Sequence, residues 1–426
     1  MEDVLQKLED PSLFEEVISS PYTIRMFRFQ NAQVLNYLAN HSHDLLKNAL
    51  SNTKTVAGNN SFQVIIQGDP SILGAVLNDE LFLNAALEIV NDKESEPFVL
   101  GRLSTITLVA LQTIPEKATQ SCVFIYRLLP HCANPSVFHL FESIVTDDPR
   151  FAYTHKWLIE FGFIDYLFRT LETIDFGYIS EEENPYFDPV FDEVFSLYQI
   201  ISRCAQNQTL FPSLIRQDII DILSMTFRFP PVFVENARWR AIRAMTIKET
   251  APMMIAIIPS AIHVLAREFK KLPAYVISAL EMINQMCVFT PVAFDFVIHS
   301  CTLQNLLNLV STFPNSTILL NSFRRFVAVG LSNPEFSIGM VTLLLPFVIE
   351  FASTRENRVL APFCFSIFDL FVEAAATNPK LRDAIREENN AKEFIMNQHK
   401  NYIKIIESEY GNEKSSVVGL FRSFLS

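Results

Sequence analysis

The segment from Leu128 to Leu171 is the part of this 426-residue chain that most constrains its fold. It contains three stretches with apolar residues at three- and four-residue intervals, which is the pattern of amphipathic helices. Short turns at Asn134-Pro135 and Asp148-Pro149 separate them, and proline at the first helical position favours a helix start. Similar units recur along the chain without a glycine-rich loop or a convincing strand between them. The sequence therefore predicts an all-α, armadillo/HEAT-like helical-repeat solenoid.

The predicted helices form two blocks with one irregular segment between them. We expect residues 1–175 to form the first helical-repeat block, residues 193–410 the second and residues 411–426 a tail, with both blocks in one continuous solenoid. Residues 176–192 combine the run Glu181–Glu183 with Pro185 and Pro189, which predicts an exposed acidic loop. The polar segment Thr53–Asn60, which contains Gly58, is interpreted as a second loop.

Composition agrees with a packed helical protein. Hydrophobic residues make up 49% of the chain and charged residues 19%, so there is material for a continuous core. The 10 glycines are too few for the tight turns and phosphate loops of nucleotide-binding α/β enzymes. The 38 phenylalanines are expected to fill the gaps between packed helices.

The net charge of -13 disfavours nucleic-acid binding, which normally uses a basic surface. The six cysteines are scattered without a Cys-x-x-Cys motif, so we expect small buried hydrophobic residues in a reducing compartment. The acidic N-terminus resembles neither a signal nor a transit peptide, which predicts a cytoplasmic protein. The apolar stretch Ala251–Ala266 is interrupted by prolines, and Ile338–Ile349 is interpreted as too short to span a membrane. Both are predicted to be buried helices.

No motif for catalysis or cofactor binding is found. The sequence lacks a phosphate-binding loop and a Gly-x-Ser-x-Gly motif. The pair His41-x-His43 would diverge on a helix, so it cannot share a metal ion. We therefore predict no catalytic residue, no metal and no cofactor. The Glu181–Glu183 run is interpreted as a solvated loop, with contact to a basic partner as the alternative.

The helix predicted over Asn236–Lys248 carries the clearest surface signal, because it is basic in an acidic chain. Its candidate partner-binding residues are Arg238, Trp239, Arg240 and Arg243. One interpretation is an amphipathic helix whose arginines lie along apolar surface or pair with local acids. The other is a docking spot for an acidic partner segment, since Trp and Arg are the commonest interface anchors.

Two motifs extend through the segment that begins at Leu128. A Leu-Leu-x-His motif precedes a turn and an apolar helix, and a Trp-Leu-x-Glu helix leads into an Ile/Leu-rich one. The first motif is Leu128-Leu129-Pro130-His131, followed by Asn134–Phe141. The second is Trp157-Leu158-Ile159-Glu160, followed by Phe163–Leu167. With an acidic, leucine-containing start at Leu8–Glu16 and a helix at Asn31–Leu38, they resemble the SAPS domain of phosphatase-associated regulatory subunits.

The resemblance covers roughly residues 1–175. It implies a non-catalytic subunit that binds the catalytic subunit of a type 2A-like (type-6) serine/threonine protein phosphatase and directs its substrate choice. Metal-dependent hydrolysis would belong to that partner. The alternative is a generic armadillo-like adaptor in trafficking or the cytoskeleton, and a helical enzyme with an unrecognised site is a remote third.

Overall fold

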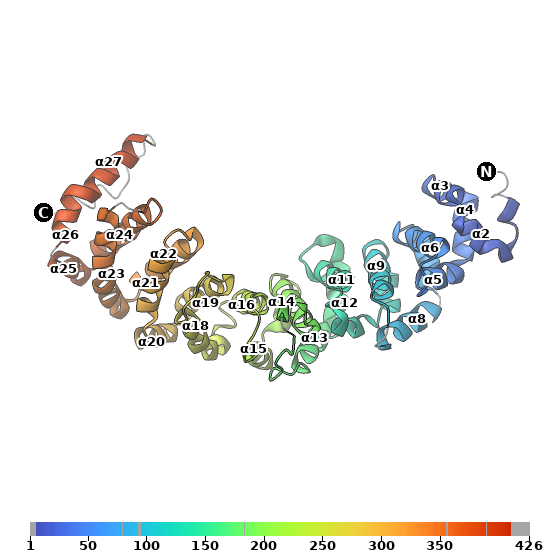
Figure 1. Ribbon diagram of the computed structural model, residues 1–426, viewed down its shortest axis with the longest axis horizontal. Coiled ribbons are helices and arrows are strands. Elements are labelled where there is room, and N and C mark those ends of the chain that lie inside the picture. The colour runs from blue at the N-terminus through green and yellow to red at the C-terminus, as the bar shows by residue number, and fades with distance from the viewer. Residues whose placement is uncertain are drawn as a thin grey trace. The chain divides into compact units, whose positions relative to one another are not determined.

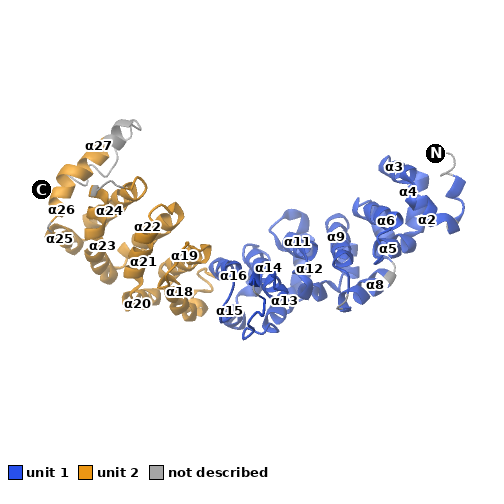
Figure 2. Cartoon of the chain, viewed as in Figure 1, with its two compact units in different colours: residues 1–245 blue, residues 246–426 orange. Residues whose placement is uncertain are grey.

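The computed structural model describes residues 6–78, 80–92, 95–182, 184–354, 357–388 and 390–409. The chain divides into two compact units, residues 1–245 and residues 246–426 (Figure 2). Both units consist of helices joined by short connections, and no strand occurs within the described ranges. The prediction of an all-α fold is confirmed.

Unit 1 contains α-helices and short 3₁₀ helices. They are η1 (Pro11–Leu13), α2 (Phe14–Ser19), α3 (Pro21–Arg28), α4 (Ala32–Asn40), α5 (Ser42–Ala49), α6 (Val56–Ile66), α7 (Pro70–Leu77), α8 (Glu80–Asn91), α9 (Pro97–Thr113), α10 (Pro115–Ser121), η2 (Ile125–His131), α11 (Pro135–Val145), η3 (Pro149–Phe151), α12 (Ala152–Glu160), α13 (Phe163–Glu172), η4 (Pro185–Phe187), α14 (Pro189–Cys204), η5 (Phe211–Leu214), α15 (Gln217–Ser224) and α16 (Val232–Met245).

Unit 2 contains longer helices and one π-helical turn, η7. Its elements are α17 (Ala251–Met254), η6 (Ile255–Ile257), α18 (Ile258–Leu265), α19 (Ala274–Phe289), α20 (Val292–Ile298), α21 (Thr302–Thr312), α22 (Thr317–Leu331), α23 (Pro334–Thr354), α24 (Leu360–Thr377), α25 (Pro379–Glu387), α26 (Ala391–Phe394), η7 (Ile395–His399) and α27 (Lys400–Glu409).

Each unit is a stack of helices in two layers (Figure 1). In unit 1, helices α2, α6, α9, α11, α14 and α16 pack on one another in chain order. The second layer follows the series α4, α7, α10 and α12. In unit 2, α19, α22 and α24 form the corresponding row, with α23 packed against both α22 and α24. Packing of each helix pair against its neighbours is the arrangement of helical-repeat proteins, which confirms the predicted fold class.

Hydrogen bonds between successive repeats show the length of the repeat. The Lys117 ammonium donates to the carbonyl of Gly74, 43 residues earlier, at 2.7 Å. In unit 2, the Arg325 guanidinium donates to the carboxylate of Glu281, 44 residues earlier, at 3.1 Å. Units of this length are typical of armadillo and HEAT repeats.

One repeat of unit 1 is longer than the others. The guanidinium of Arg240 on α16 donates to Gln199 on α14, 41 residues earlier, at 3.1 Å. The equivalent bond from α14 to α11, from Arg203 to Glu142, spans 61 residues. The connection between α13 and α14, residues 173–188, accommodates the extra chain. This connection is therefore an insertion within the stack.

The Asx-Pro turns start helices, as the sequence predicts. The side chains of Asp69, Asn134 and Asp188 each accept a hydrogen bond from a backbone N–H in the first turn of the following helix. Each is followed by proline at the first helical position, where the missing N–H costs no helical hydrogen bond. Such a pair ends one helix and begins the next at a defined residue.

The predicted loop over Thr53–Asn60 is wrong for its second half. Helix α6 begins at Val56, and the Thr55 hydroxyl caps it by accepting from the N–H of Gly58 at 2.9 Å. A Cβ at position 58 would lie 2.9 Å from the carbonyl oxygen of Asn48. Glycine therefore allows the start of α6 to approach the end of α5 closely, and it does not mark a flexible connection.

The predicted acidic loop, residues 176–192, lies inside unit 1. It ends earlier than expected, because Asp188 caps α14 and the helix begins at Pro189. Glu183 of the glutamate run and the predicted tail, residues 411–426, lie outside the described residues.

Phenylalanine dominates the interior, as expected from its abundance. Most of the largest fully buried side chains are phenylalanines: Phe27, Phe82, Phe124, Phe141, Phe151, Phe163, Phe191, Phe323, Phe326 and Phe368. Five of the six cysteines are buried, and burial raises the pKa of Cys122, Cys287 and Cys364 to about 12. Cys301 is exposed, so the prediction of uniformly buried cysteines is wrong there.

Two helices of unit 2 are long and apolar enough to cross a membrane by length and composition. They are Pro334–Ser353, with mean hydropathy 1.8, and Leu360–Thr377, with mean hydropathy 1.5. The stretch Ile338–Ile349 was expected to be too short to span a membrane. That expectation is wrong, because the stretch is part of α23, a helix of 21 residues that is not ended by Pro346. About half of each helix is buried inside the unit, which is also what core helices show. The absence of a membrane span stays a prediction.

Candidate protein-interaction surface

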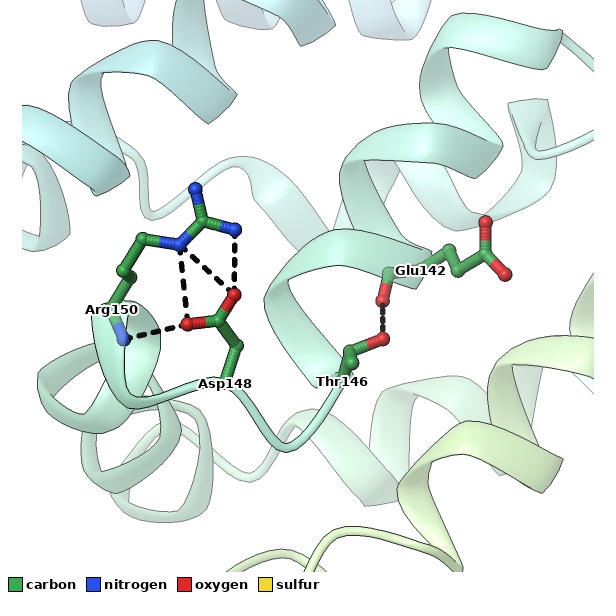
Figure 3. Close-up of polar contacts among 4 residues, drawn as sticks. All are labelled: Glu142, Thr146, Asp148 and Arg150. Atoms are coloured by element: carbon green, nitrogen blue, oxygen red, sulfur yellow. Dashed lines mark hydrogen bonds and ion pairs between the residues drawn. The ribbon is translucent and has the colours of Figure 1, made fainter.

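Polar contacts stabilise the second turn of the segment that resembles the SAPS domain (Figure 3). Asp148 accepts from the backbone N–H of Arg150 at 2.9 Å and from its guanidinium at 2.6 Å. These hydrogen bonds hold the pKa of the Asp148 carboxyl below its ordinary value. At the end of α11, the Thr146 hydroxyl donates to the carbonyl of Glu142 at 2.6 Å. All of these contacts are local, so they stabilise the turn.

The polar and aromatic residues of the two motifs have packing contacts. A ring nitrogen of His131 lies 3.1 Å from the carbonyl oxygen of Val90, in hydrogen-bonding range. The indole of Trp157 stacks on the ring of Phe161 with centroids 5.2 Å apart. These contacts explain why such residues occur at these positions, and they identify no partner. The resemblance stays a prediction.

Two of the four residues predicted on the basic helix are inside the molecule. Arg238 is 3% exposed and Trp239 is 1% exposed. The Trp239 indole N–H donates to Glu235 at 3.1 Å, and the Arg238 guanidinium lies 3.6 Å from the same carboxylate. The guanidinium also donates to the carbonyls of Leu223 and Ser224, where α15 ends. The prediction of a surface role is wrong for this pair, because both side chains are buried and that of Arg238 joins α16 to the end of α15.

The other two residues, Arg240 and Arg243, are exposed on α16. Arg240 donates to Gln199 on α14, which leaves part of its guanidinium accessible. The structure thus divides the predicted spot into a buried network and two surface arginines. Their binding to an acidic partner stays a prediction.

The insertion between α13 and α14 is ordered by one buried carboxylate. Asp188 is 2% exposed and accepts from the hydroxyls of Tyr178 at 2.7 Å and Ser180 at 2.6 Å. Its other oxygen accepts from the N–H of Val190 at 3.0 Å and so caps α14. Burial alone would raise the pKa of Asp188, but these hydrogen bonds outweigh it and lower the pKa. The ionised carboxylate therefore ties the insertion to α14.

Aromatic contacts join the insertion and the start of α14 to the connection between α15 and α16 and the start of α16. The ring of Phe176 packs on Phe227 with centroids 5.1 Å apart, and Phe191 meets Phe227 edge-on at 5.2 Å. The ring of Tyr186 stacks on Phe233 at 5.2 Å. Two irregular segments that are about 50 residues apart in the sequence thus form one structural element.

Large apolar side chains project from this element into solvent. Among the described residues, six of the eighteen strongly exposed large apolar side chains belong to it, and each lies within three residues of a ring contact just given. Phe187 is 75% exposed and Phe229 is 68% exposed. We call the following residues the loop surface: Ile179, Glu181, Glu182, Tyr186, Phe187, Met225, Phe229 and Val232.

The loop surface is acidic. Between Arg169 and Arg203 the sequence has eight acidic residues and no Lys, Arg or His. One cation is close: the Arg228 guanidinium lies over the Phe229 ring, 5.2 Å from its centroid. From the sequence, this segment was interpreted as a solvated loop, with contact to a basic partner as the alternative. The interleaving of aromatic residues with the acids was the signal that could have identified it, because a purely solvated loop needs no aromatic side chains.

Within the described ranges, no group of three or more His, Cys, Asp or Glu residues is arranged to hold a metal ion. His41, part of the only close histidine pair in the sequence, hydrogen-bonds the carbonyl of Tyr37 at 2.8 Å and stacks on Phe14.

Compared with known proteins, the sequence matches no family model and no curated protein. Solved structures match in fold. An engineered protein solved by the Northeast Structural Genomics Consortium is 12% identical, with a TM-score of 0.58 over 100% of this chain and 98% of that one. Kap121p is 12% identical with a TM-score of 0.48, over 100% of this chain and 45% of that one. A structure described as a phosphorylation switch that controls the interaction between cadherin and beta-catenin is 11% identical, with a TM-score of 0.43 over 99% of this chain and 94% of that one. The first likeness supports the helical fold alone.

Proposed function

We propose that this chain is a non-catalytic, cytoplasmic scaffold that binds other proteins through its helical repeats. The observation that supports the proposal most directly is the loop surface, where large apolar side chains are exposed on an ordered insertion. Exposed apolar patches commonly mark interaction sites, and insertions in repeat stacks often lie on the binding face.

The test compares partner capture by matched variants of the purified chain. We expect the immobilised chain to capture defined proteins from native cytosol, and Phe187→Ala with Phe229→Ala to lose at least one of them. Phe29→Ala is the control, because Phe29 is 74% exposed on unit 1 but lies on α3's C-terminal end, away from the insertion. Identical capture by all variants, quantified by mass spectrometry, would contradict a role for the loop surface in partner binding.

We also infer a more specific candidate, a regulatory subunit of a type 2A-like serine/threonine phosphatase. The motifs that begin at Leu128 and Trp157 support it by resemblance. The catalytic subunit would carry the metal-dependent hydrolysis, and this chain would direct it to substrates. Recovery of such a catalytic subunit, with phosphopeptide hydrolysis in the captured material, is the expected result. Recovery of tubulin, actin or coat proteins without a phosphatase would favour the generic adaptor.

A further inference from the structure

We propose that the loop surface binds a short partner segment in which basic residues lie next to large apolar ones. This inference rests on the proposed scaffold function and adds the chemistry of the partner. Four properties of the surface carry it: its independence from the repeat stack, its order, its apolar side chains and its charge.

The packing of the helices in unit 1 does not require the insertion. Helix α14 packs on α11 and α16 packs on α14, as in the other repeats, although the chain between α11 and α14 is longer. The side chains of Tyr186 and Phe187 are exposed rather than packed between helices. Solvent-exposed aromatic rings stabilise a fold little, so their presence on an insertion points to a role outside the fold.

The surface is already ordered without a partner. Asp188 accepts from the hydroxyls of Tyr178 and Ser180. The Phe176–Phe227 contact holds the N-terminal part of the insertion, and the Tyr186–Phe233 stack holds its C-terminal part. A site that is preformed loses less conformational entropy on binding, so a short segment can bind with useful affinity. Tyr and Phe rings are also suitable anchors, because they bury a large area with few rotatable bonds.

The negative charge at the loop surface favours a basic partner segment. Asp175, Glu181 and Glu182 lie on the insertion, and Glu172 and Asp192 flank it, all of them exposed. The nearby Arg228 is placed over the Phe229 ring. An acidic partner segment would therefore be repelled, whereas Lys or Arg side chains would gain both the carboxylates and the faces of the exposed rings.

The same charges disfavour two other occupants. A second copy of this chain has a net charge of -13, so its approach would be opposed at low ionic strength. An anionic membrane surface would be repelled by the carboxylates for the same reason. A peptide segment with both basic and apolar side chains can contact the exposed aromatic rings and pair with the carboxylates.

An unbiased peptide selection tests this inference. A random-peptide library displayed on phage is selected on the full chain, after depletion on the Phe187→Ala, Phe229→Ala double variant. We expect enrichment of peptides with Lys or Arg beside Leu, Phe or Trp. Enrichment of acidic peptides, or no enrichment over the double variant, would overturn the proposal.

The affinity of a selected peptide for each variant, measured by fluorescence anisotropy, separates the contribution of the aromatic rings from that of the carboxylates. The Phe187→Ala, Phe229→Ala variant should bind at least about tenfold more weakly. Glu181→Lys with Glu182→Lys should also weaken binding and reduce its salt dependence. Glu116→Lys with Glu160→Lys changes the net charge equally at exposed positions elsewhere on unit 1, and should bind as the unaltered chain does. Equal weakening by both charge variants would contradict a local site.

The two proposals fail differently. If cytosolic capture depends on Phe187 and Phe229 but the selected peptides are not basic, the partner chemistry is wrong and the scaffold function stands. If capture does not depend on these rings, the loop surface is not a binding site and both proposals lose their support. Circular dichroism and thermal unfolding of each variant show that the changes are at the surface and not in the fold.

Discussion

Helix α16 and the insertion between α13 and α14 differ in where they place their aromatic side chains. On α16, the basic helix, Trp239 is inside the molecule together with Arg238. On the insertion, whose sequence is typical of a loop, the side chains of Tyr186 and Phe187 are exposed to solvent. The difference follows from neighbours: α16 packs on both α14 and α15, whereas the rings of the insertion extend past the helices that support it. Composition alone therefore does not show which of the two regions exposes its aromatic side chains.

The largest expected effect breaks the buried network of α16. Arg238→Ala leaves the Glu235 carboxylate buried without its counter-charge, and the carbonyls of Leu223 and Ser224 lose a donor. We expect a loss of about 3–5 kcal/mol in the free energy of unfolding, measured with denaturant. The paired change Arg238→Met with Glu235→Gln should lose less than the single variant. An unchanged stability in Arg238→Ala would show that this arginine is not structural.

A smaller effect is expected at the support of the insertion. Asp188→Ala removes the α14 cap and both hydroxyl contacts, so we expect a loss of about 1–2 kcal/mol. Amide hydrogen exchange should accelerate in residues 176–182. Asp188→Asn can keep the cap while replacing one acceptor oxygen, so it should lose less stability. If exchange in the insertion is the same in all three proteins, Asp188 does not order it.

The pH dependence of unit 1 is expected to involve Glu193 on α14. Burial raises the pKa of this carboxyl from 4.5 to about 7. The folded state thus binds the proton more tightly than the unfolded state, and stability from this group is lost as pH rises from 4.5 to about 7. Glu193→Gln should therefore raise the Tm by about 2–4 °C above pH 7, and have little effect below the ordinary pKa. Glu160→Gln, at an exposed position on α12, is the control for the substitution itself.

The smallest effect on stability is expected at the exposed arginines of α16. Arg240→Glu with Arg243→Glu should change the free energy of unfolding by no more than about 0.5 kcal/mol, because both side chains are exposed. Capture of an acidic partner segment should nevertheless weaken. Unaltered capture would show that these arginines are solvated surface residues without a role in partner binding. The loop surface would then be the remaining proposed binding region of unit 1.

Much of the fold could be predicted from local sequence. Asn134-Pro135 and Asp148-Pro149 begin helical elements where expected, because capping and proline act within one turn. The start of α6 was missed, since Gly58 permits close packing against a residue of the preceding helix, a contact that no local pattern shows. The candidate site was harder to predict. Glu181 and Glu182 were identified as part of a charged run that could contact a basic partner, and the apolar residues of the loop surface were not identified.

The sequence by itself determined that this chain folds into repeated helices, because helix starts, helix faces and the absence of strand patterns are local properties. Only the tertiary structure decided which arginine and aromatic residues are covered. A 3.6-residue period shows which side chains share a face, but it does not show whether another helix packs on that face. In unit 1 the covering helix comes from the adjacent repeat or from the other layer. Arg238 and Trp239 are consequently buried by packing between helices. Phe187 on the insertion and Phe229 on the connection between α15 and α16 are left in solvent.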